Sequence, residues 1–300
     1  MPEAKLDTTQ KAQAINFDRN KYGTFAEIGA GQEVARWFFQ VGGAAGTVAK
    51  SMSAYDMAVS DAIYGNAERY VSQDRLLHML DHEYDLLNER LSADRGGETR
   101  FFVYANTVSA RSFSHQQDGQ GWMGIRFQTN PMAPPNDIIM HVRLLDEENL
   151  KQQEAVGILG VNLVHGAMEY PDDPHRILEE LLDGLEAWRA EVGMLRFSGP
   201  DFEAVDNRIM ALELVQQGHA KATLFNADGE VVHPTEVLYH KPIIVERGSF
   251  RPVIHTTLHM LQSGMAQFVQ EKKVNGEEVT VLFEMTLQNL TDSGVIDHQD

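Results

Sequence analysis

The sequence FFVYANTVSA, residues 101–110, is rich in aromatic and β-branched residues, which favour a β-strand. Two similar runs follow it, WMGIRFQT at residues 122–129 and IIMHVRLL at residues 138–145. The segment between these two runs contains Pro131, Pro134 and Pro135, which cannot donate hydrogen bonds to a sheet. We therefore expect a loop there, and the three runs predict three strands of one β-sheet.

Downstream of these strands, the hydrophobic pattern alternates between helices and strands. Helices are expected at residues 148–170, 173–191, 200–218 and 253–272. Strands are expected at residues 194–198, 221–226, 231–239, 241–246 and 277–290. This alternation over more than half of the chain predicts an α/β fold, with a mixed sheet and covering helices.

Upstream of residue 101, the pattern is mostly helical. Val34, Trp37, Phe38 and Val41 recur at the spacing of one helix face, and leucines repeat the pattern between residues 76 and 91. The pattern stops at Gly96 and Gly97. We therefore expect a mostly helical N-terminal region at residues 1–95 and an α/β domain at residues 96–300.

Composition excludes several classes of function. The formal net charge of −19 opposes binding to nucleic acids and to anionic lipid surfaces. The absence of cysteine excludes disulfides, Fe–S clusters and zinc ribbons. The longest apolar run, residues 156–164, is far below the roughly 20 residues of a membrane-spanning helix, and residues 1–20 lack the apolar core of a secretory signal. These features predict a soluble cytoplasmic protein without nucleic-acid or membrane partners.

Residues 242–255, PIIVERGSFRPVIH, combine a predicted strand, a glycine turn and the start of a helix. Such a junction directs backbone N–H groups and the helix dipole toward one point, where a phosphate group can bind. The residues expected to bind a nucleotide there are Arg247, Gly248, Ser249, Phe250, Arg251, His255 and His259. The alternative is an ordinary strand-to-helix connection with surface arginines.

The segment GSFRPV, residues 248–253, resembles the G-[ST]-F-x-P-[IV] loop of nicotinamide or nicotinate mononucleotide adenylyltransferases. In that family the loop follows the first strand of a Rossmann-like sheet. The resemblance implies transfer of the AMP part of ATP to a pyridine mononucleotide with loss of pyrophosphate, using magnesium. Ile254 and Thr257 stand where the family has Thr or His and a second histidine, so the motif histidine is out of register.

A wider resemblance spans nearly the whole chain. The segments KYGTFAEIGAGQEVAR, residues 21–36, and RFSGP, residues 196–200, are similar to the N-terminal part of a poorly characterised bacterial family. Its members are called either nicotinamide or nicotinate mononucleotide adenylyltransferases or TonB-dependent receptors. The resemblance implies a bacterial protein, and ATP and magnesium as its cofactors.

His78 and His82 are candidate metal ligands. They lie four residues apart on a predicted helix, so both side chains project from one face at a spacing that can chelate Zn²⁺, with Asp81 or Glu83 nearby. The alternative is a solvated helix face without a metal.

Two glycine-rich segments fail as nucleotide motifs. Gly29 and Gly31 resemble the start of a dinucleotide fingerprint, but Val34 occupies the position of the third glycine. Gly46 and Lys50 are too far apart for a phosphate-binding loop. The sequence thus predicts a nucleotide-binding protein through residues 247–259, and leaves open whether it is an enzyme. The alternative is a non-catalytic subunit of a homo-oligomeric assembly or scaffold.

Overall fold

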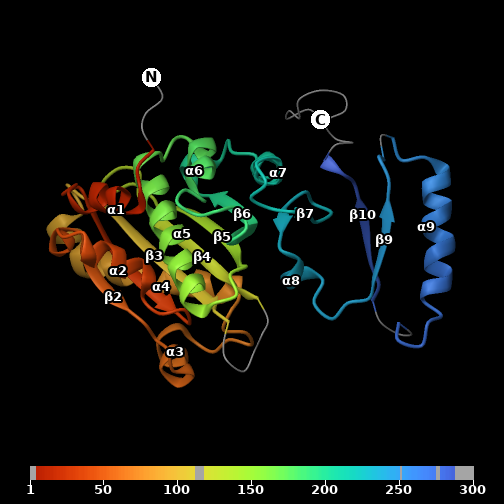
Figure 1. The fold of residues 1–300 in the computed structure, drawn as a ribbon, viewed down its shortest axis with the longest axis horizontal. Coiled ribbons are helices and arrows are strands. Elements are labelled where there is room, and N and C mark those ends of the chain that lie inside the picture. Colours follow the sequence, from red (N-terminus) through yellow and green to blue (C-terminus); the bar gives the residue numbers. More distant parts are fainter. Residues whose placement is uncertain (1–4, 112–117, 251, 275–277, 288–300) are drawn as a thin grey trace. The chain divides into compact units, whose positions relative to one another are not determined.

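A computed structural model describes residues 5–111, 118–250, 252–274 and 278–287 of the 300-residue chain. The backbone divides into two compact units, residues 1–223 and residues 224–300. Figure 1 shows the helices and strands of both units. The division expected from sequence between residues 95 and 96 stays a prediction.

The first unit is built on a six-stranded sheet in the order β2-β1-β3-β4-β5-β6. Strand β1, next to the edge strand β2, is parallel to both of its neighbours, β2 and β3, whereas β4, β5 and β6 continue the sheet in antiparallel pairs. The strands are β1 Lys21–Ile28, β2 Val48–Met52, β3 Arg100–Ser109, β4 Gly119–Phe127, β5 Asn136–Leu144 and β6 Ala190–Ser198.

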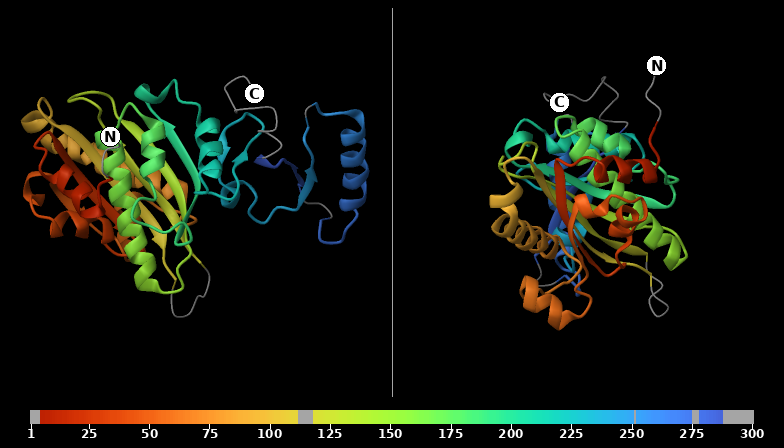
Figure 2. Two further views of the ribbon diagram at one scale, coloured as in Figure 1. Left: turned by 45° about the horizontal axis from the view of Figure 1, so that its top comes forward. Right: turned by 90° about the vertical axis from the view of Figure 1, so that its left-hand side faces the viewer.

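Helices cover both faces of this sheet. Figure 2 shows the long helices α4 and α5 on opposite sides of it, and α1 and α2 pack on the α5 side. The helices are α1 Thr8–Asn16, α2 Glu33–Gln40, α3 Met57–Tyr64, α4 Gln73–Arg95, α5 Asn149–Glu169, α6 Pro174–Glu180 and α7 Asn207–Gln216. Two 3₁₀ turns, η1 Ala44–Gly46 and η2 Pro200–Phe202, complete the unit.

The largest part of the hydrophobic core lies between the sheet and α5. Inward-facing residues of β1, β3, β4 and β5 pack there against the apolar face of α5. Helix α2 approaches α5 closely because α5 carries Gly157 and Gly160 at the contact. A Cβ atom on Gly160 would lie only 2.2 Å from Val34 and 2.8 Å from the hydroxyl of Tyr104, so a larger residue there would push the two helices apart.

The second unit contains a strand–helix–strand crossover. Strands β9 and β10 are parallel and are joined through α9. A short antiparallel pair, β7 and β8, and the one-turn helix α8 precede the crossover. The elements are β7 Leu224–Phe225, β8 Val231–Val232, α8 Pro234–Val237, β9 Ile243–Arg247, α9 His255–Phe268 and β10 Thr280–Glu284.

The structure confirms the predicted α/β fold with a mixed sheet and covering helices. The N-terminal region nevertheless contains two strands, β1 and β2, that the sequence pattern had placed in a helical region. The helix expected at residues 173–191 ends at Glu180, and β6 already begins at Ala190. The strand expected at residues 231–239 is interrupted because Pro234 starts the helix α8.

Within the part of the chain that the structure describes, no helix combines the length and the apolar character needed to cross a membrane.

Candidate functional site

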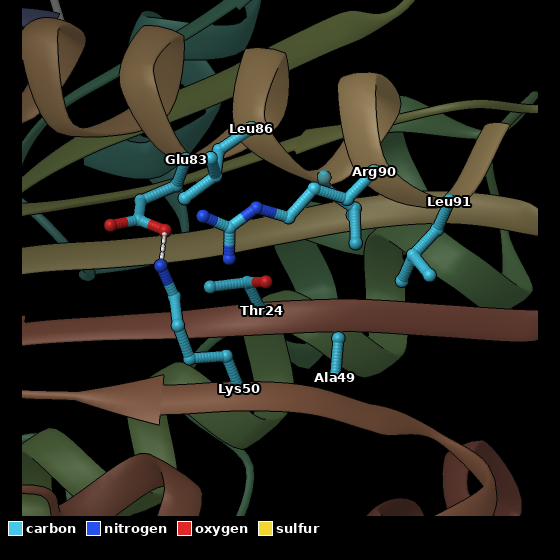
Figure 3. A pocket seen from close by; sticks show the side chains of 8 residues that line it. Thr24, Ala49, Lys50, Glu83, Leu86, Arg90 and Leu91 are labelled. Atoms are coloured by element: carbon cyan, nitrogen blue, oxygen red, sulfur yellow. Dashed lines mark ion pairs between the residues drawn. The ribbon is translucent and has the colours of Figure 1, made fainter.

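A cavity of about 230 Å³ lies between α4 and the strands β1 and β2 (Figure 3). Five of the side chains that line it come from one face of α4, because their spacing follows the turns of the helix. The others come from the two strands. The lining residues are Thr24 on β1, Ala49 and Lys50 on β2, and Glu83, Leu86, Leu87, Arg90 and Leu91 on α4.

The strand side of the cavity is formed at an irregularity in the pairing of β1 with β2. Gly23 pairs with Val48, but the next residue, Thr24, pairs with Lys50, so Ala49 is an extra residue in β2. A bulge of this kind bends a strand and redirects its side chains, and bulges are frequent beside functional sites. Here the small side chain of Ala49 and the long one of Lys50 both border the cavity.

Glu83 supplies the buried negative charge of the site. One of its carboxylate oxygens accepts a hydrogen bond of 2.9 Å from the hydroxyl of Tyr64 on α3, and the other forms an ion pair with the ammonium group of Lys50. Burial raises the pKa of the Tyr64 hydroxyl, and the adjacent carboxylate of Glu83 raises it further. Tyr64 therefore stays protonated and donates a hydrogen bond to Glu83, while Lys50 forms an ion pair with the carboxylate.

Arg90 is the cation of the cavity that has no partner. Lys50 is committed to Glu83, but the guanidinium group of Arg90 forms no hydrogen bond or ion pair with any residue that the structure describes. In Figure 3 its side chain runs from α4 toward Glu83, and the guanidinium lies between α4 and Thr24 of β1. A guanidinium group offers a rigid fork of donors that matches a carboxylate. Arg90 is an exposed residue that borders the cavity, so its guanidinium group is available to an anion from solution.

The wall of the cavity is otherwise apolar. Leu86, Leu87 and Leu91 form the helix side, and Ala49 adds a methyl group from the strand side. Ligand sites typically combine such a surface with a few placed polar groups. The arrangement suits a small molecule with an anionic end and an aliphatic body.

The loop expected to bind a nucleotide lies in the second unit, between β9 and α9. Two of its predicted phosphate contacts already have partners: Arg247 forms an ion pair of 2.7 Å with Glu284, and the N–H of Gly248 donates to the Glu284 carbonyl at 3.1 Å. Phe250 adopts a φ of 50°, and its ring packs against Phe283 with centroids 5.0 Å apart.

The other predicted residues of this loop lie along the connection and at the start of α9. His255 begins α9, and His259 follows one turn later; both side chains are exposed. Ser249 lies in the connection, and Arg251 lies outside the described residues. The first turn of α9 has no side-chain cap. Phosphate binding by this loop therefore stays a prediction.

The predicted metal ligands His78 and His82 both lie on α4 and are exposed. The ring of His82 packs edge-on against that of Tyr64, with centroids 5.5 Å apart. Of the two carboxylates expected nearby, Glu83 is paired with Lys50 and Tyr64, and Asp81 forms an ion pair with Arg126. Among the described residues no group of three potential ligands is close enough to hold a metal ion.

Most residues of the cavity carry no signal in the sequence. Glu83 is noticeable there only as a neighbour of His82, and Lys50 only as a lysine too far from Gly46 for a phosphate-binding loop; Thr24 and Arg90 belong to no motif. A usable signal existed on α4, where Glu83 and Arg90 lie seven residues apart and therefore on one helix face. The strand partners could not be found in this way because β1 and β2 were expected to be helical.

Comparisons with known proteins give similarity of fold only. No protein-family model matches the chain, and no curated protein matches it. The competence/damage inducible protein CihA from Agrobacterium tumefaciens matches with 14% identity and a TM-score of 0.37, over 55% of this chain and 97% of that chain. A CinA superfamily protein from Enterobacter cloacae matches with 12% identity and a TM-score of 0.37, over 55% of this chain and 94% of that one.

A CinA superfamily protein from Escherichia coli matches with 13% identity and a TM-score of 0.36, over 53% of this chain and 87% of that chain. These findings contradict the resemblance to the bacterial family called adenylyltransferases or TonB-dependent receptors. The structural similarity found is instead to competence/damage-inducible proteins, over about half of this chain.

Proposed function

We propose that the protein binds a small organic monocarboxylate in the cavity between α4 and strands β1 and β2. The observation that supports this most strongly is the unpartnered guanidinium group of Arg90 beside an apolar wall. A carboxylate can accept two parallel hydrogen bonds from a guanidinium group, and such charge-assisted bonds are about twice as strong as neutral ones.

The charge of the lining favours a monoanion over a more highly charged ligand. Lys50 and Arg90 are positive and Glu83 is negative, so the cavity carries one net positive charge. A phosphoryl group carries about −1.5 to −2 charges near pH 7 and would leave charge uncompensated beside Glu83. A single carboxylate balances the cavity.

The size of the cavity limits the ligand further. Its volume of about 230 Å³ lies below the roughly 300–1,000 Å³ of sites that enclose drug-sized ligands. This volume accommodates an aliphatic acid of about five carbon atoms, but only part of a nucleotide. Nucleotide binding at residues 247–259, with ATP and magnesium, and homo-oligomerisation remain separate predictions from the sequence.

The first prediction concerns Arg90→Gln. Isothermal titration with isovalerate should show binding to the wild-type protein, and the variant should bind about 10- to 100-fold more weakly, because hydrogen bonds to charged groups contribute roughly 1.5–3 kcal/mol. Isovaleramide, which has the same shape without the charge, should bind weakly to both proteins.

The matched control is Arg36→Gln, which removes an equal charge from an exposed position on α2. It should leave isovalerate binding unchanged. Equal affinity of the wild type and Arg90→Gln for isovalerate, or no binding of isovalerate to the wild type, would contradict the proposed function.

A further inference from the structure

Thr24 carries a polar group that the fold does not use. The residue is 2% exposed and borders the cavity from β1, and no residue that the structure describes forms a hydrogen bond with its hydroxyl. Figure 3 shows its side chain in the cavity, between α4 and β2. The hydroxyl oxygen is not among the fully buried polar atoms that lack a partner, so it borders the open space of the cavity. The hydroxyl of Thr24 is therefore available to a bound molecule.

Only some polar groups of the cavity are free to form a hydrogen bond with a ligand. The carboxylate of Glu83 is occupied by Lys50 and Tyr64, which leaves the hydroxyl of Thr24 and the guanidinium of Arg90 as the free groups. A hydroxyl both donates and accepts a hydrogen bond, so it can pair with a hydroxyl of the ligand. An ammonium group is disfavoured, because the lining is already positive and like charges repel.

We infer that the natural ligand is a small hydroxy acid. This inference rests on the proposed function: the carboxylate binds Arg90, a ligand hydroxyl binds Thr24, and the aliphatic part packs on Leu86, Leu87 and Leu91. Thr24 is then a specificity-determining residue that distinguishes a hydroxy acid from the corresponding acid without the hydroxyl. An amino acid of the same size is selected against by its ammonium group.

The test compares three ligands and three proteins by calorimetric titration. The ligands are isovalerate, 2-hydroxyisovalerate and 3-hydroxyisovalerate; the proteins are the wild type, Thr24→Val and Thr24→Ser. Valine has nearly the shape of threonine without the hydroxyl, and serine keeps the hydroxyl without the methyl group. At least one hydroxy acid should bind the wild type about three- to tenfold more tightly than isovalerate, as one neutral hydrogen bond provides.

The preference for the hydroxy acid over isovalerate should disappear in Thr24→Val and persist in Thr24→Ser. The affinity of Thr24→Val for isovalerate itself should change little. Three results would overturn the inference alone: isovalerate binds the wild type as tightly as both hydroxy acids, the preference survives in Thr24→Val, or it is lost in Thr24→Ser. The absence of binding by all three acids would overturn the proposed function as well, so the two failures are distinguishable.

Discussion

Replacement of Phe25 by alanine is expected to lower the free energy of unfolding of the first unit by about 3–5 kcal/mol. The side chain is fully buried on β1, where its ring lies 4.7 Å from that of Phe38, 5.7 Å from Phe102 and 6.0 Å from Tyr104, between ring centroids. Its removal leaves a cavity that these residues, held by α2 and β3, cannot fill.

Urea denaturation followed by tryptophan fluorescence measures this effect. All three tryptophans, Trp37, Trp122 and Trp188, belong to the first unit, so their fluorescence reports its unfolding. The control is Phe17→Ala, which removes the same ring from a position that is 66% exposed and should change stability by less than about 1 kcal/mol. A similar loss of stability in both variants would contradict the assignment of Phe25 to the core.

Glu27→Gln is expected to change how stability depends on pH. Burial raises the pKa of Glu27 to about 7, although hydrogen bonds from the N–H groups of Ala35 and Val34 and from the amide of Asn106 oppose the shift. The carboxyl group is protonated in both states below about pH 4.5, its unshifted pKa. As the pH rises toward 7, the unfolded chain releases its proton first, so the folded state loses stability.

The loss attributable to Glu27 amounts to about 3 kcal/mol between pH 4 and pH 8, at 1.36 kcal/mol per pKa unit. Glutamine cannot ionise, so Glu27→Gln should gain about this much relative to the wild type over that range. Urea denaturation at pH 4, 6 and 8 measures the difference. Glu89→Gln, at an exposed position of α4, should follow the wild type. An equal pH dependence of the wild type and Glu27→Gln would exclude Glu27 as the group responsible.

Strands β3, β4 and β5 were predictable because their own residues, many of them aromatic or β-branched, favour a strand. The runs at residues 101–110, 122–129 and 138–145 coincide with β3, β4 and β5 to within three residues. Strand β1 was not predictable from the hydrophobic pattern of the sequence. It is buried on both faces, so its polar and apolar residues do not alternate. Its Gly23 and its buried Glu27 also lower the strand propensity of the segment.

Strand β2 was missed for a different reason. It has only five residues, all half-buried, and it lies at the edge of the sheet. Its backbone conformation is fixed by pairing with β1 rather than by its own composition, which includes alanine, lysine and serine. Tertiary pairing therefore determines this part of the fold.

The candidate site was largely hidden from sequence reasoning for the same reason. Thr24, Lys50 and Arg90 are separated by 26 and 40 positions along the chain, and each is an ordinary residue in its local context. They share one cavity only because β2 pairs with β1 at the bulge beside Ala49 and α4 packs over both strands. The short motif at residues 248–253 predicted a phosphate site by its composition. In the structure, Arg247 beside it forms an ion pair with Glu284, and the N–H of Gly248 donates a hydrogen bond to the Glu284 carbonyl.

A crystal structure of the protein soaked with 2-hydroxyisovalerate and, separately, with isovalerate tests the assignment of the cavity most directly. The carboxylate of at least one of these acids should lie within hydrogen-bonding distance of the Arg90 guanidinium, with its branched end against Leu86, Leu87 and Leu91. Binding of both acids elsewhere on the molecule, or a cavity that holds only water at saturating concentrations of each, would contradict it.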